Sequence, residues 1–178
     1  MLRKGSRENA ARTERAVLRY KKTVYGIAVT QLSSKSEADD VFQEVFMTYL
    51  TKAPEFGSEE HEKAWLIRTT INICKRYNVL PRWISIETFS DNVADIRLDT
   101  EEQRRVFDEV RSLPDKYRIA IYLYYFEGMS TSECAKTLKL GESAFRKRLS
   151  RGRELLRKRL ESEIYETDLQ ANTNTAFP

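Results

Sequence analysis

Residues 130–160 read STSECAKTLKLGESAFRKRLSRGRELLRKRL, and their pattern of apolar, polar and basic residues indicates how the second half of the chain folds. It divides into a short helix, a tight turn and a longer basic helix. Ser130 and Glu133 have the spacing of a capping box at the start of the short helix. Gly141 stands where the second helix needs its N-cap, and Phe145 begins the apolar side of that helix. The pattern predicts a helix-turn-helix, whose second helix can lie in the major groove of DNA.

The second helix of this pair is strongly basic. Nine Lys and Arg residues occur from Lys139 to Leu160, and within that stretch only Glu142 and Glu154 offset them. A basic run on a helix is usually a solvated face, but a patch of this density repels itself unless it meets phosphate. Because the basic helix also follows a capped short helix, the sequence favours DNA binding over a solvated helix pair.

Composition narrows the class of protein. The chain has 178 residues, of which 33% are charged and 40% hydrophobic, with a net charge of +4, and this suits one or two small domains. No apolar run is long enough to span a bilayer or to act as a secretion signal, so we expect a cytoplasmic protein. Cys74 and Cys134 are far apart, and His61 is the only histidine, so we expect no metal, no cofactor and no enzymatic activity.

Helical spacing dominates the chain, and Gly and Pro are few. We therefore expect an all-α protein of two small helical domains joined by an acidic linker, the second containing the helix-turn-helix. The expected boundaries are a first domain over 8–78, the linker over 79–100, a second domain over 101–163 and a disordered tail over 164–178.

Within the first domain the spacing predicts a polar, frayed start and three helices. The first helix is expected from about Thr13 to Leu32, and the second from Glu37 to Leu50 with Ser36 as its N-cap. A loop over 51–62 follows, since Pro54 and Gly57 interrupt the helical pattern. The third helix is then expected over 63–78.

The second helix carries a polar stripe beside its apolar one. The stripe is acidic and ends in an adaptable apolar side chain: Asp40, Gln43, Glu44 and Met47. It can be a solvated face, or it can be a docking surface for a basic partner helix. The spacing alone leaves both interpretations open.

The third helix gathers an aromatic ring, an amide and three cations on one side. Such a surface suits nucleic acid, because aromatic rings stack on bases and cations neutralise phosphates. The alternative is that the aromatic ring belongs to the rim of the core and the cations are solvated. Phe56, in the preceding loop, can likewise pack inward or stack on a base, and packing is the commoner fate. The residues on this side of the helix are Trp65, Arg68, Asn72, Lys75 and Arg76.

Three segments, in this order and at these separations, resemble those of bacterial RNA polymerase sigma factors of the extracytoplasmic-function (ECF) type. EADDVFQEVFMTYL resembles the family's polymerase-binding helix, and AWLIRTTINICKRYN resembles its promoter-melting and downstream-box helix. SLPDKYRIAIYLYYFEGMSTSECAKTL, followed by SAFRKRLSRGRELLRKRL, resembles its upstream-box domain. The resemblance covers roughly residues 17–160. The main alternative is a stand-alone helix-turn-helix regulator that does not bind polymerase.

The resemblance implies partners and a role for each surface. Asp40, Gln43, Glu44 and Met47 would bind the clamp coiled-coil of the RNA polymerase core, and the loop over 52–63 would capture a flipped base of the downstream box. Phe56, Trp65, Arg68, Asn72, Lys75 and Arg76 would contact the DNA of that box. Glu142, Ser143, Arg146, Lys147, Ser150 and Arg151 would read the upstream box, while Arg118 would hold a phosphate. The family is commonly held inactive by an anti-sigma factor, often membrane-bound, and the chain itself would not insert into a membrane.

Two glycines depart from the family pattern. Gly141 stands where the family usually has Ser, which should cost the recognition helix only a few tenths of a kcal/mol. Gly152 stands where Ala is usual, at a cost of about 1 kcal/mol by helix propensity.

Overall fold

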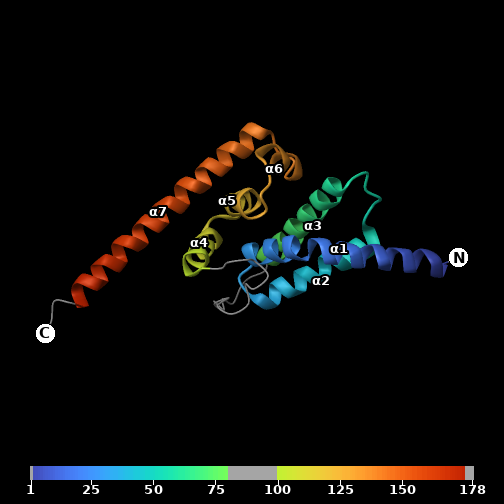
Figure 1. Ribbon diagram of the computed structural model, residues 1–178, viewed down its shortest axis with the longest axis horizontal. Coiled ribbons are helices and arrows are strands. Elements are labelled where there is room, and N and C mark those ends of the chain that lie inside the picture. The colour runs from blue at the N-terminus through green and yellow to red at the C-terminus, as the bar shows by residue number, and fades with distance from the viewer. Residues whose placement is uncertain (1, 80–99, 175–178) are drawn as a thin grey trace. The chain divides into compact units, whose positions relative to one another are not determined.

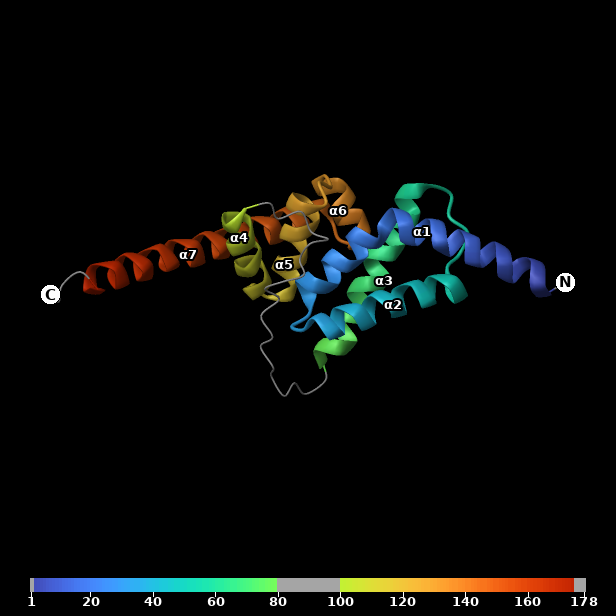
Figure 2. The same ribbon diagram turned by 60° about the horizontal axis from the view of Figure 1, so that its bottom comes forward.

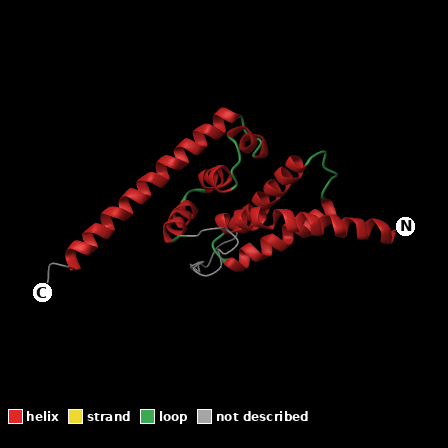
Figure 3. Ribbon diagram, in the orientation of Figure 1, coloured by secondary structure: helices red, strands yellow, loops and turns green. Residues whose placement is uncertain are grey.

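The computed structural model describes the backbone of residues 2–79 and 100–174. Every regular element in these two ranges is helical, as the sequence predicts (Figure 3). The chain forms two compact units, and the acidic linker expected over 79–100 lies, except at its ends, outside the described residues. None of the described helices is both long enough and apolar enough to cross a membrane.

The first unit consists of three helices that pack side by side, α1 (Leu2–Gln31), α2 (Lys35–Lys52) and α3 (Glu59–Val79) (Figures 1 and 2). Each helix turns one apolar stripe inward, and each large side chain buried there contributes about 1.5–3 kcal/mol. This core fixes which faces of α2 and α3 remain outside. Its fully covered members include Val24, Ile27, Val41, Val45, Leu66 and Ile67.

The start of α2 differs from the prediction. Its N-cap is Ser34, not Ser36, because Ser34 has a glutamate three residues further on and Ser36 does not. The Ser34 hydroxyl accepts a hydrogen bond from the backbone N–H of Glu37 at 3.2 Å, and the Glu37 carboxylate accepts one from the Ser34 N–H at 3.3 Å. The two bonds form a complete capping box.

The other two helices of the first unit begin earlier than expected. α1 is already helical at Leu2, so the frayed start predicted for the N-terminus is wrong; Arg, Glu and Ala, which favour helix, dominate this segment. α3 begins at Glu59 and not at Lys63. Three glutamates lie in its first turn, where negative charge suits the positive end of the helix. The loop between α2 and α3 is therefore only residues 53–58.

The second unit consists of α4 (Glu101–Ser112), α5 (Asp115–Ile121), a π-helical turn η2 (Tyr122–Phe126), α6 (Thr131–Thr137) and α7 (Glu142–Asn174). Thr100 caps α4 by accepting from the Gln103 N–H at 3.2 Å. After η2, Gly128 takes a positive φ of 66°, as expected of a glycine at a helix end. The core of this unit includes Phe107, Val110, Leu113, Ile121, Leu123, Phe145 and Leu149.

α7 ends later than predicted, and it carries a buried glycine in its interior. The tail predicted to be disordered from residue 164 continues the helix to Asn174, in a segment that contains neither Gly nor Pro before its end. Gly152 is buried, and a Cβ there would lie 3.2 Å from a side-chain carbon of Ile121. Its cost in helix propensity is therefore accompanied by a close approach of α5 to α7.

Candidate polymerase and nucleic-acid interfaces

The helix-turn-helix predicted from residues 130–160 is present. The backbone N–H of Glu133 donates to the Ser130 hydroxyl at 3.2 Å, and the Ser130 N–H donates to the Glu133 carboxylate at 2.8 Å, so the capping box of α6 is complete. Lys139 makes the turn with a left-handed φ of 54°. The carbonyl of Gly141 accepts from the Phe145 N–H at 3.0 Å, which places Gly141 at the N-cap of α7, as expected.

The recognition face of α7 is on the outside. Phe145 and Leu149 are buried against the unit's core, and this orientation turns the opposite side of the helix to solvent. All six α7 residues predicted to read the upstream box are exposed there: Glu142, Ser143, Arg146, Lys147, Ser150 and Arg151. They lie in the N-terminal part of the helix, which is the part that a helix-turn-helix presents to base edges.

On this face the guanidinium groups of Arg146 and Arg151 form ion pairs with carboxylates of the same helix. Glu142 accepts from Arg146 at 2.6 Å and from the Thr131 hydroxyl at 3.0 Å. Arg151 donates to Glu154 at 2.7 Å, and this hydrogen bond lowers the pKa of the Glu154 carboxyl below its ordinary value. Pairs this exposed contribute little to stability, so a DNA phosphate can replace either carboxylate at low cost.

Repulsion among the cations of this helix is weaker than expected from Glu142 and Glu154 alone, because other carboxylates also pair with them. Arg157 also lies 3.7 Å from Glu161, one turn further along α7. Arg159 lies 3.8 Å from Glu109 of α4. The second of these partners is distant in sequence, so the local charge count could not include it.

Arg118, predicted to hold a phosphate, differs from the other upstream-box residues. Its side chain is only 14% exposed, and it forms an ion pair with Asp115 one turn earlier in α5. Only part of this guanidinium therefore faces solvent in the unbound protein.

The polar stripe of α2 is a surface feature. Asp40 and Gln43 are exposed, Met47 is 58% exposed, and the Glu44 side chain is 37% exposed. Glu44 forms an ion pair with Arg76 of α3. The stripe is therefore accessible to a partner, and one of its carboxylates already holds a cation from the predicted DNA-binding side of α3.

The aromatic residues of the predicted downstream-box surface form one cluster. The Phe56 ring stacks on Tyr49 with centroids 6.1 Å apart, and the Trp65 ring meets Phe56 edge-on at 5.9 Å. Phe56 thus packs onto the unit while staying partly exposed. Arg68 follows Trp65 along α3, and Asn72, Lys75 and Arg76 are exposed further along the same helix.

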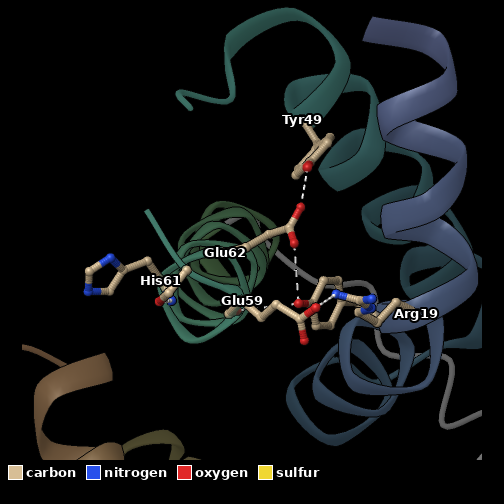
Figure 4. A network of polar contacts seen from close by, with 7 residues as sticks. Arg19, Tyr49, Glu59, His61 and Glu62 are labelled. Atoms are coloured by element: carbon tan, nitrogen blue, oxygen red, sulfur yellow. Dashed lines mark hydrogen bonds and ion pairs between the residues drawn. The ribbon is translucent and has the colours of Figure 1, made fainter. Parts of the chain in front are cut away.

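A polar network that shares Tyr49 with this cluster was not predicted from the sequence (Figure 4). Glu62, in the first turn of α3, accepts from the Tyr49 hydroxyl of α2 and lies 3.3 Å from the Tyr20 hydroxyl of α1. Arg19 pairs with Glu59, whereas His61 points away from the network (Figure 4). The tyrosines fall on the apolar stripes of their helices, so their spacing gives no sign of the polar role of their hydroxyls.

The network predicts a pH dependence of stability. Burial, reinforced by the hydrogen bond to Glu62, raises the pKa of Tyr49 from 10.0 to about 12. Between these values the unfolded chain releases the Tyr49 proton and the folded chain keeps it, so the free energy of unfolding falls as pH rises. We expect urea unfolding across this window to show a steeper loss of stability for the wild type than for Tyr49→Phe. Parallel curves would contradict the assignment.

The geometry defines a class of protein: over the described residues it has two helical units, one with an exposed helix-turn-helix suited to DNA and one with an exposed acidic helix face. Comparisons with known proteins narrow this class. Residues 16–78 match the family Sigma-70 region 2, and residues 103–156 match Sigma-70, region 4.

Individual relatives agree with these matches. The chain is 28% identical over 158 residues to the ECF RNA polymerase sigma factor SigW of Bacillus subtilis, covering 79% of this chain and 84% of SigW. It is 28% identical over 138 residues to the RNA polymerase sigma factor SigZ of the same organism, covering 74% of this chain and 77% of SigZ. The fold is similar to that of the sigma factor RpoE of Bartonella quintana, with a TM-score of 0.61, 22% identity, and coverage of 83% of this chain and 96% of that one.

The chain belongs to the ECF subfamily of RNA polymerase sigma factors. It directs RNA polymerase to promoters and takes part in transcription initiation, and the stand-alone regulator is not favoured.

Proposed function

We propose that the chain binds the polymerase core through the outer face of α2 and reads the two promoter boxes with its two separate units. The observation that carries this proposal is the exposed stripe of Asp40, Gln43, Glu44 and Met47 on a unit that matches sigma region 2. The chain contributes binding energy and no catalytic group of its own, and it acts in the cytoplasm with the polymerase.

Binding to the polymerase core depends on charge complementarity and on one apolar contact. A coiled-coil of basic character in the polymerase clamp complements the carboxylates of Asp40 and Glu44, which steers the encounter and sets the register. Met47, 58% exposed at the end of the stripe, supplies an adaptable apolar contact. Glu44 also pairs with Arg76, which is proposed to contact DNA. Binding of the polymerase at Glu44 would therefore change the environment of Arg76.

Downstream-box binding rests on the aromatic cluster and the cations of α3. A base taken out of the duplex costs a few kcal/mol of stacking and pairing, and the site must offset this cost. Phe56 and Trp65 offer ring surface to an unpaired base, while Lys75 and Arg76 are exposed to neutralise the adjoining backbone.

Upstream-box binding rests on the first turns of α7. Arg146 and Lys147 are placed for base edges or phosphates, and Ser143 and Ser150 for shorter polar contacts. Arg118 would contribute at most part of its guanidinium to a phosphate, given its pair with Asp115.

Each unit alone would bind DNA weakly, and a common anchor on the polymerase makes the two sites act together. We propose that region 2 occupies 8–78 and region 4 occupies 101–163, with the acidic segment 79–100 joining them.

An anti-sigma factor is the proposed regulator. One structure similar to this fold is that of RpoE in complex with the anti-sigma factor NepR, and another is that of CnrH in complex with the cytosolic domain of CnrY. A cognate anti-sigma factor, membrane-bound or not, would compete with the polymerase for the surfaces described above.

Reconstituted transcription tests the function. Core polymerase, with and without the purified chain, would transcribe a library of duplex fragments that contain a random stretch, and the RNA would be sequenced. We expect transcripts with a defined start only when the chain is present, and two enriched sequence boxes upstream of that start. A random start distribution with the chain present, together with tight binding of duplex DNA by the chain alone, would favour the stand-alone regulator.

A further inference from the structure

Arg12 connects three parts of the first unit. Its Nε donates to the Tyr49 hydroxyl of α2 at 3.1 Å, and its terminal nitrogen donates to the backbone carbonyl of Pro54 in the loop over 53–58. Its guanidinium carbon also lies 5.1 Å from the centre of the Tyr49 ring and 5.2 Å from the centre of the Phe56 ring. Arg12 lies before residue 16, where the match to region 2 begins.

The loop over 53–58 depends on such contacts for its shape. It contains no regular backbone structure, so no helical hydrogen bonds fix the backbone of residues 54–57, and side-chain contacts with the rest of the unit limit its freedom. Arg12 supplies one at Pro54, and it covers the ring of Phe56, which stacks on Tyr49. A planar guanidinium can donate in two directions and stack on a ring at the same time, which a lysine ammonium cannot.

We propose that Arg12 is a positioning residue that holds the loop over 53–58, and with it the rings of Phe56 and Trp65, in the form that binds the unpaired strand of the downstream box. This inference rests on the proposed function of that surface. It assigns to the N-terminal part of α1 a role in DNA binding that the helix performs through the loop.

Direct contact between Arg12 and DNA is the competing explanation. Arg12 lines a hollow of about 720 Å³ together with Arg15 and Arg19, but Glu55 and Glu59 line it as well. Two features favour the indirect role: the acids oppose phosphate in this hollow, and Arg12 already engages a carbonyl, a hydroxyl and two rings. Arg15 lines the same hollow and serves as the matched control for charge.

The test uses the full chain bound to core polymerase. The probe is a fluorescent single strand with the non-template sequence of the downstream box, taken from a promoter found by the library transcription above. We expect Arg12→Gln to weaken binding of this strand about tenfold, since both hydrogen bonds and the ring contacts are removed. Arg12→Lys should recover little of the loss, because an ammonium group does not reproduce the planar fork of the guanidinium. Arg15→Gln should stay within about twofold. Equal losses for Arg12→Gln and Arg15→Gln, or full recovery with lysine, would overturn the proposal.

A double-mutant cycle with Phe56→Ala separates positioning from direct contact. If Arg12 acts through the loop, Arg12→Gln costs clearly less once Phe56 is gone than it does in the wild type, whereas independent contacts give additive losses. Arg12→Gln should lower the thermal midpoint somewhat, because it removes contacts within the unit, but the variant should be folded at the assay temperature and bind the polymerase core like the wild type. A parallel loss of affinity for the polymerase core would reduce Arg12 to a structural residue and overturn the proposal. Wild-type binding by Arg12→Gln also overturns it and leaves the proposed function intact. Failure of the wild-type complex to bind any strand would refute the proposed function itself.

Discussion

Replacing Arg146, Lys147 and Arg151 together by Ala is expected to weaken binding of the upstream box at least a hundredfold. All three side chains are exposed on the outer side of α7, and a good bidentate base contact contributes about 1–3 kcal/mol. Side chains that meet only phosphate should instead lower the salt slope of binding by about one each. The measurement is the affinity of the chain–core complex for a duplex promoter at several salt concentrations.

A matched triple variant controls for net charge. Arg157→Ala, Lys158→Ala and Arg159→Ala remove the same charge from the same helix further from its N-terminus, where all three residues are also exposed. We expect this control to lose much less affinity and to keep the promoter preference. If the two triple variants behave alike, α7 binds DNA as a general basic helix and does not read the sequence.

Reversing charge on α2 should have the largest effect on polymerase binding. Asp40→Arg combined with Glu44→Arg places two cations where a basic coiled-coil docks, and opposed like charges at an interface cost several kcal/mol. We expect the affinity for core to fall at least a hundredfold, measured by titration of the fluorescently labelled chain with core in the absence of DNA.

Glu44 needs a separate control, because it pairs with Arg76 within the chain. Glu44→Arg with Arg76→Glu restores that pair in reverse and still removes the acid from the docking face. If Glu44 contacts the polymerase, the swap will not recover core binding. Recovery would show that the intramolecular pair matters and that Glu44 makes no such contact. Glu8→Arg with Glu14→Arg, exposed acids on α1, should leave core affinity near that of the wild type.

The parts of the fold that depend on local spacing were predictable. The apolar stripes correctly predicted helices and an all-α fold, and the spacing of Ser130 and Glu133 correctly predicted where α6 begins. The same rule, applied to Ser34 and Glu37, would have found the true start of α2. The continuation of α7 to Asn174 was missed because polar helix formers without periodicity look like a tail.

What the sequence could not supply is contact between distant residues. Arg12 and Pro54, Glu44 and Arg76, and Tyr20 and Glu62 are brought together only by the packing of α1, α2 and α3. The predicted surfaces of α2 and α7 proved to be exposed because a stripe opposite a core must face outward.

Size-exclusion chromatography of the wild-type chain mixed with core polymerase shows whether the chain binds the polymerase. We expect the chain to co-elute with the polymerase core as one complex at moderate salt, and the Asp40→Arg, Glu44→Arg variant to elute separately. Separate elution of the wild-type chain at low salt, with tight binding of duplex DNA by the chain alone, would contradict it.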